Sequence, residues 1–207
     1  DCNAAALNFF EITADQLPGK TIKDFAPQDF DEKNIEKHQR LWKTGGIIET
    51  PYLINGKKKT LELSIIPLEW KSKPVVFGVG KDITETKIHQ QRFWELFKNM
   101  PVGVALWKPT DNGRDFILEE INPAGEKLTG KNKKDIVGKT ALEAFPAIEK
   151  FGLLEVLKKV YRTGQTTFFP AALYDEGELS GWFENNVYKL PDGHVIDIHP
   201  WEYNEVP

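Results

Sequence analysis

The chain is poor in cysteine and has no long apolar run, and each shortage excludes a class of protein. Its single cysteine, Cys2, excludes an internal disulfide framework and cannot form a cysteine-based zinc site by itself. No apolar stretch approaches the roughly 20 residues of a membrane-spanning helix, and no signal peptide opens the chain. We therefore expect a cytoplasmic segment. Because it starts with Asp1 and not Met, we expect a longer parent protein, for which membrane attachment stays open.

An excess of basic residues is also missing. Lys and Arg number 27 against 31 Asp and Glu, and this net charge of -4 argues against nucleic acid as a partner. Hydrophobic residues make up 40% of the chain and charged residues 28%, a balance that supports packed cores. The 207 residues are enough for two domains of about 100 residues each.

Recognisable catalytic patterns are absent as well. The four histidines are not grouped with Asp, Glu or Cys at the spacing of metal ligands. Gly19-Lys20-Thr21 and Gly138-Lys139-Thr140 resemble the end of a phosphate-binding loop, but Ala14 and Lys133 stand where that loop needs its first glycine. No Ser-His-Asp arrangement is recognisable either. We expect no enzyme activity, no catalytic residue and no metal site in this segment.

An internal repeat organises what is present. Asn3 recurs 119 positions later as Asn122, and three further markers keep this spacing. They are Gly19-Lys20-Thr21 with Gly138-Lys139-Thr140, Pro27 with Pro146, and Thr44-Gly45 with Thr163-Gly164. A shared register of this kind indicates two copies of one domain.

Helices are predicted in the first part of each copy. Asn3 and Asn122 are good N-caps, and Pro123 suits the first position of a helix, so short helices are predicted at 3–10 and 122–128. Longer helices are predicted at about 29–43 and 147–162, each ending before a Thr-Gly pair.

Antiparallel strands are predicted in the second part of each copy. Asn55-Gly56 is a strong hairpin turn between strands at 47–54 and 60–68, and a buried strand is predicted at 75–79. In the second copy, strands at 182–190 and 195–198 flank another Asx-Gly turn, with Trp182 expected to be buried. Only the second copy has opening strands, at 102–107 and 116–121.

This order of elements resembles the PAS fold. Asp82-Ile83-Thr84-Glu85-Thr86-Lys87 is similar to the Asp-Ile-Thr-Glu-Arg-Lys signature that ends many bacterial and archaeal PAS domains. The resemblance implies an α+β fold of two PAS-like domains, each an antiparallel sheet flanked by short helices, joined by a helix. The implied limits are 1–85 for a first domain that lacks its opening strands, 86–100 for a connector helix and 101–207 for the second domain.

The exit signature predicts a group of residues for signal relay. Asp82 is expected to cap the connector helix, and Glu85, three residues later, to reach back in a capping box. We therefore assign signal relay to Asp82, Ile83, Thr84 and Glu85.

The connector helix carries an apolar stripe. Its members, at helical spacing, are Phe93, Leu96, Phe97 and Met100. The stripe packs on its own domain or pairs with a second chain. The second alternative predicts a homodimer.

The resemblance implies a sensory, signal-input function. The module binds a small ligand or mediates dimerisation, and relays the signal through exit helices to an output domain outside this chain, with a sensor histidine kinase as the expected parent. The alternatives are a structural dimerisation module without a ligand, and a haem or flavin sensor. The sequence does not identify a cofactor.

Candidate binding residues follow from the same resemblance. PAS domains commonly bind ligands between the inner face of the sheet and the helices, and Asn185 shares a strand face with Phe183 and Val187. Asn185 is either a ligand contact or a structural asparagine. His38 lies on the long helix from which haem-binding PAS domains present a ligand, about one turn from the expected position.

The missing opening strands have a structural consequence. In a PAS sheet these strands lie beside the closing strand, so their absence would leave the edge of 75–79 unpaired. We expect upstream residues of the parent protein, another chain or the C-terminal segment to pair with it, and upstream residues are the preferred alternative.

Overall fold

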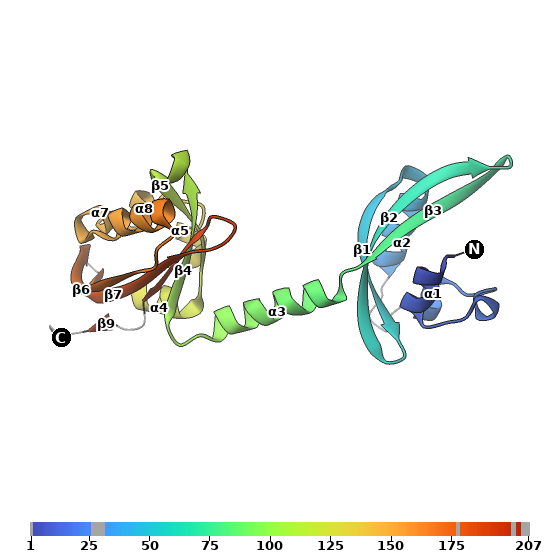
Figure 1. Ribbon diagram of the computed structural model, residues 1–207, viewed down its shortest axis with the longest axis horizontal. Helices are drawn as coiled ribbons and strands as arrows, with labels where there is room; N and C mark the ends of the chain where they lie inside the picture. The colour runs from blue at the N-terminus through green and yellow to red at the C-terminus, as the bar shows by residue number, and fades with distance from the viewer. Residues whose placement is uncertain (1, 26–31, 177–178, 200–201, 204–207) are drawn as a thin grey trace. The chain divides into compact units, whose positions relative to one another are not determined.

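The computed structural model describes residues 2–25, 32–176, 179–199 and 202–203, which form two compact units (Figure 1). The first unit is Asp1–Arg92 and the second is Phe93–Pro207, each with an antiparallel sheet and cores of its own. The predicted α+β class and the repeat of one fold are therefore confirmed. The predicted domain limits stay predictions, since the boundary between the units falls within a single helix.

The first unit begins with helices and ends with a sheet in the order β1-β2-β3. The helices are α1 (Ala4–Phe10), two 3-10 turns (Ala14–Gln16 and Ile22–Phe25) and α2 (Glu32–Thr44). The strands are β1 (Gly46–Ile54), β2 (Lys57–Trp70) and β3 (Lys73–Asp82). Asn55 and Gly56 have φ values of 48° and 77°, the left-handed pair that the predicted two-residue hairpin requires. Pro27 and the start of the helix predicted at 29 lie outside the described residues.

Alternate residues of β1 and β2 form the core of the first unit. Tyr52, Ile54 and Leu61 pack with apolar residues of the helical segment, including Phe9 and Phe10. Along β2, Leu61 and Ile65 are buried, whereas Glu62, Leu63 and Ser64 are all half-buried. Tyr52 is buried with this cluster, and loss of hydration raises the pKa of its hydroxyl to about 12.

The prediction that 75–79 is a buried strand is wrong. Every residue of β3 is exposed, and Phe77 keeps 55% of its surface accessible. The second unit supplies the reason, because its corresponding strand β8 (Val195–His199) lies between two strands and is almost entirely buried. Within the described residues, β3 pairs only with β2, and the C-terminal β9 (Glu202–Tyr203) pairs with β7 instead. Pairing by upstream residues or another chain stays a prediction.

The second unit has a five-strand path in the order β5-β4-β8-β7-β6, with β9 attached to β7. The strands are β4 (Gly103–Thr110), β5 (Asp115–Ile121), β6 (Thr167–Glu176), β7 (Leu179–Lys189) and β8. The helices α4 (Pro123–Thr129), α5 (Lys133–Ile136), α6 (Ala141–Ala144), α7 (Ile148–Phe151) and α8 (Leu153–Thr163) connect β5 to β6. A short 3-10 turn, Asp111–Gly113, joins β4 to β5. Figure 1 shows α7 and α8 lying over the sheet near β6 and β7.

Three sequence expectations for this unit need correction. The single helix predicted at 147–162 is two helices, because Gly152 at φ 96° ends α7 and starts α8. Strand β6 was not predicted, and the apolar segment after Thr167 was its available signal. Trp182 is half-buried and not a core residue. The buried tryptophan of this unit is Trp107, which is 1% exposed.

Residues that recur 119 positions apart in the sequence occupy equivalent places in the two units. Asn3 and Asn122 both cap a helix by accepting a hydrogen bond through the side-chain oxygen. Gly19 and Gly138 share a left-handed backbone, with φ values of 84° and 87°. The Thr-Gly pairs agree as well, because the glycine that follows α2 and the one that follows α8 have φ values of 72° and 69°.

Helix α3 (Thr84–Asn99) connects the last strand of the first unit to β4. No helix within the described part of the chain is both long and apolar enough to cross a membrane.

The separate cores predict separate unfolding. Leu157 of α8 is fully buried in the core of the second unit, so Leu157→Ala should lower its free energy of unfolding by about 2 to 5 kcal/mol. Leu142→Ala is the matched control, because that leucine is exposed and its loss should change stability by less than about 0.5 kcal/mol. In differential scanning calorimetry, an equal shift of every transition in Leu157→Ala would contradict the two-unit description.

Candidate functional site

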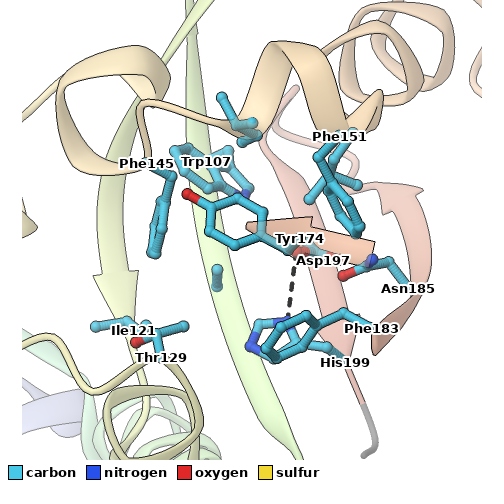
Figure 2. A pocket seen from close by; sticks show the side chains of 13 residues that line it. Trp107, Ile121, Thr129, Phe145, Phe151, Tyr174, Phe183, Asn185, Asp197 and His199 are labelled. Carbon is cyan, nitrogen blue, oxygen red and sulfur yellow. Dashed lines mark ion pairs between the residues drawn. The ribbon is translucent and has the colours of Figure 1, made fainter. Parts of the chain in front are cut away.

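A cavity of about 50 Å³ lies inside the second unit, between the inner face of the sheet and the helices (Figure 2). Five strands and three helices contribute to its wall, together with Phe145 directly after α6. The lining residues are Ala105, Trp107, Ile121, Thr129, Phe145, Ile148, Phe151, Leu153, Tyr174, Phe183, Asn185, Asp197 and His199. Most of them are apolar, and a few polar groups converge on the same space, which is the usual composition of a small-molecule site.

The pairing of the central strands brings the polar side chains together. Asp197 of β8 lies opposite Ala105 of β4 and Val187 of β7, so its side chain is on the face that carries the core. Residues two positions apart in a strand share a face, which places His199 beside Asp197 and Asn185 beside Val187. Figure 2 shows Asn185, Asp197 and His199 close together on the sheet side of the cavity.

Asp197 and His199 form a buried pair. The distance between Nδ1 of His199 and Oδ2 of Asp197 is 3.4 Å, marked by the dashed line in Figure 2. Both residues are more than nine-tenths buried. The contact uses Oδ2 of Asp197 and Nδ1 of His199, so Oδ1 of Asp197 and Nε2 of His199 are available to a third group.

Four buried polar atoms at this cavity have no hydrogen-bond partner within the described part of the protein. They are Trp107 Nε1, Asn185 Nδ2, Asp197 Oδ1 and His199 Nε2. An unpaired buried polar group costs roughly 1 to 3 kcal/mol, and proteins usually pair such groups. Four of them around one cavity make it the candidate functional site of this unit.

A second polar network begins at Tyr174, which lines the cavity from β6. The hydroxyl of Tyr174 donates to Glu176, whose other oxygen is 2.7 Å from Nζ of Lys131. Burial and the neighbouring Glu176 carboxylate both raise the pKa of Tyr174 well above its ordinary value. Tyr174 therefore remains a neutral donor to Glu176, and Lys131 offsets the charge of that carboxylate.

Two of the three strand residues proposed from the sequence lie at this cavity. Asn185 and Phe183 line it, whereas Val187 is fully buried in the core and does not. Their role in binding stays a prediction. Asp197 and His199 were missed. Their available signal was a carboxylate inside the apolar segment Val195–His199, which was itself predicted to be a strand.

His38 lies in the first unit and does not line this cavity. It is buried, and its Nε2 is 2.8 Å from Oγ1 of Thr50 in β1. Among the described residues, no group of three or more His, Cys, Asp or Glu could hold a metal ion.

The proposed relay residues form the junction between β3 and α3. Asp82 accepts hydrogen bonds from the backbone amide and the hydroxyl of Thr84, and the same hydroxyl accepts from the amide of Thr60 in β2. Ile83 is buried, and its amide donates to the carbonyl of Thr60. Thr84, and not Glu85, makes the side-chain bonds here, and no capping-box bond from Glu85 is observed within the described chain.

The other end of α3 is held by Asn122. Its side-chain amide donates to the carbonyls of Phe97 and Val102, at 3.1 and 2.9 Å, and its oxygen accepts from the amides of Val104 and Gly125. The Phe97 side chain packs on the outer face of the sheet, against Val104 and apolar neighbours. Sequence reasoning predicted the cap of α4 by Asn122 but not its bonds to α3 and β4.

Comparison with known proteins gives one family for both units. Residues 1–85 match a family model described as "PAS domain", and residues 97–199 match one described as "PAS fold". A search of curated proteins found no match.

The chain is also similar to solved structures. One is a domain of a sensory box sensor histidine kinase/response regulator from Geobacter sulfurreducens, with 12% identity, a TM-score of 0.46, and coverage of 57% of this chain and 99% of that chain. Another is the PAS domain of an HTR-like protein from Haloarcula marismortui, with 15% identity, a TM-score of 0.40, and coverage of 56% and 99%.

The unpaired amide of Asn185 leads to a stability prediction. Asn185→Leu should raise the free energy of unfolding of the second unit by about 1 kcal/mol or more, because it removes a buried donor without a partner. Asn186→Leu is the control on the opposite face of β7, where the change should stay within about 0.5 kcal/mol. If chemical denaturation shows that Asn185→Leu destabilises the unit, Asn185 is a structural residue and not a ligand contact.

Proposed function

Because the chain belongs to the PAS family, matched in tandem over residues 1–85 and 97–199, we propose that it is a sensory input module whose second unit binds a small ligand. The module is not itself catalytic, and it passes the state of the cavity through helices to an output domain outside this chain. A sensor histidine kinase is the proposed parent.

One observation carries the ligand-binding part of this proposal. Asn185, Asp197 and His199 are each more than nine-tenths buried, and each has a polar atom at the cavity without a partner in the described protein. A purely structural core would favour apolar side chains at these positions, since unpaired buried polar groups reduce stability. Retaining three of them supports a function that needs their chemistry.

The position of His199 suggests how occupancy is passed on. A Cβ added at Gly103 would lie 2.2 Å from Cδ2 of His199, so the ring occupies the space over that glycine. Gly103 is the first residue of β4, and α3 ends at Asn99. A ligand that moves the His199 ring would therefore act on backbone only a few residues from the end of α3.

The proposed path continues along α3. Its last turn is bonded to Asn122, and its first turn is bonded to the sheet of the first unit through Thr84 and an ion pair between Lys87 and Glu49 at 2.6 Å. Each end is thus fixed by polar contacts to its own unit. A change in either unit would reach the helix through these contacts, which supports the assignment of Asp82, Ile83 and Thr84 to relay, whereas no contact supports that of Glu85.

Ligand occupancy is tested by native mass spectrometry of the purified chain. We expect a bound small molecule that is lost in Gly103→Ala, because the added methyl group displaces the His199 ring. Lys108→Ala is the control, since it shortens an exposed side chain on the same strand as Gly103. Amide exchange at 97–104 should increase when the ligand is removed. An empty cavity in the native chain, with exchange there unchanged by any added compound, would contradict ligand sensing.

Dimerisation is a second candidate function, supported by exposed apolar side chains on α3. Phe93, Leu96 and Met100 lie on this helix and its end at helical spacing, and Leu96 is 65% exposed. Phe97, by contrast, is buried against its own unit, so the stripe predicted from sequence divides into an inward and an outward part. The outward part supports pairing with a second copy of this chain.

The dimer is tested by sedimentation velocity. Leu96→Glu should convert a dimer into a monomer, because it places a charge on the outward stripe. Lys98→Glu, on an exposed position of the same helix, should leave the association unchanged. A native chain that stays monomeric at about 0.1 mM would remove this candidate.

A further inference from the structure

We propose that the cavity of the second unit binds a small organic ammonium ion that also carries a hydrogen-bond acceptor. The inference rests on the proposed ligand-binding function and adds the chemical class of the ligand. It is carried by the hydrogen-bonding types, the charge and the aromatic content of the cavity wall.

The unpaired atoms define what the ligand must offer. The indole N–H of Trp107 can only donate a hydrogen bond, and the carboxylate oxygen of Asp197 can only accept one. Neither assignment depends on an amide flip or a histidine tautomer. The ligand must therefore present at least one acceptor and at least one N–H or O–H donor.

The charge of the wall favours a cation as the donor. Asp197 is an acidic residue, and no Lys or Arg is among the described residues that line the cavity. Lys131, whose Nζ is 5.3 Å from the ring centroid of Phe145, is paired with Glu176. A buried carboxylate needs an opposite charge or strong donors, so an ammonium group beside Oδ1 is the complement of this site.

Aromatic rings surround the same space. Five of the lining residues are aromatic, and Figure 2 shows them on several sides of the cavity: Trp107, Phe145, Phe151, Tyr174 and Phe183. Ring faces attract cations, with tryptophan the strongest, and the attraction increases where water is excluded. Carboxylate and aromatic faces together select for organic ammonium ions over simple anions.

His199 does not block the carboxylate. Its Nδ1 lies 3.4 Å from Oδ2 of Asp197, whereas Oδ1 is the oxygen without a partner. The contact with His199 therefore leaves Oδ1 available. The rival arrangement is a protonated His199 that holds an anion through Nε2, and the two predict opposite effects of substitution.

The volume of the cavity limits the size of the ligand. About 50 Å³ is far below the several hundred Å³ of drug-sized sites. A molecule of roughly four non-hydrogen atoms is the size expected without opening of the wall. A two-carbon aliphatic molecule with an ammonium group at one end and a hydroxyl group at the other meets both the size limit and the hydrogen-bonding requirements.

Three compounds with this frame separate the alternatives. Ethanolamine carries an ammonium and a hydroxyl group, ethylene glycol is its neutral analogue, and glycolate is the anionic one. Titration is followed by the indole N–H resonance of Trp107, assigned through Trp107→Phe. For so small a ligand we expect a dissociation constant on the order of 0.1 to 10 mM.

The expected result is saturable binding of ethanolamine, with glycolate and ethylene glycol weaker by about tenfold or more. Asp197→Asn should weaken ethanolamine by at least about tenfold, and by more than His199→Gln does, because the Asp197 carboxylate pairs directly with the ammonium group. Asp175→Asn is the matched control, because Asp175 is exposed on β6 and should change nothing. Circular dichroism of each variant confirms that the fold is retained.

Several outcomes would overturn the inference. Glycolate binding that equals or exceeds that of ethanolamine would indicate an anion site. Loss of glycolate binding in His199→Gln, with ethanolamine binding unaffected by Asp197→Asn, would indicate the same. A copurified ligand without an ammonium group, identified by native mass spectrometry, rejects the ligand class and leaves the sensory function standing. No copurified ligand together with no response of the Trp107 resonance to any of the three compounds rejects both.

Discussion

The second unit depends on a single buried side chain, Asn122, for the junction of four segments. Its amide bonds the end of α3 and the residue before β4, and its oxygen bonds β4 and the first turn of α4. Asn3 occupies the same place in the first unit, but it is exposed, and within the described residues its side chain makes only the helix-capping bond. The same residue type therefore closes a strand junction where opening strands are present and only begins a helix where the described residues contain none.

Local features of the fold could be predicted from the sequence. The N-caps at Asn3 and Asn122 and the turn at Asn55-Gly56 depend on residues within one or two turns of each other, so their signals are contiguous in the chain. Errors occurred where a distant partner decides the outcome. β3 has the composition of a buried strand, yet its exposure depends on whether another strand covers its edge.

The cavity was predictable only in part for the same reason. Asn185 was found because a polar residue alternating with apolar ones is visible within one strand. Asp197 and Trp107 become binding candidates only when the β4–β8 pairing places them on one wall, which requires the tertiary structure. The break at Gly152 was missed because a single glycine within a helical pattern is compatible with either one helix or two.

The four unpaired atoms of the cavity also bear on how long the protein persists. Their desolvation makes the empty folded state less stable than an apolar core of the same size would be. A molecule that pairs with them binds the folded state and not the unfolded chain, so occupancy adds to the free energy of unfolding by mass action. In a cell that degrades unfolded chains, the abundance of such a protein would itself follow the concentration of its ligand.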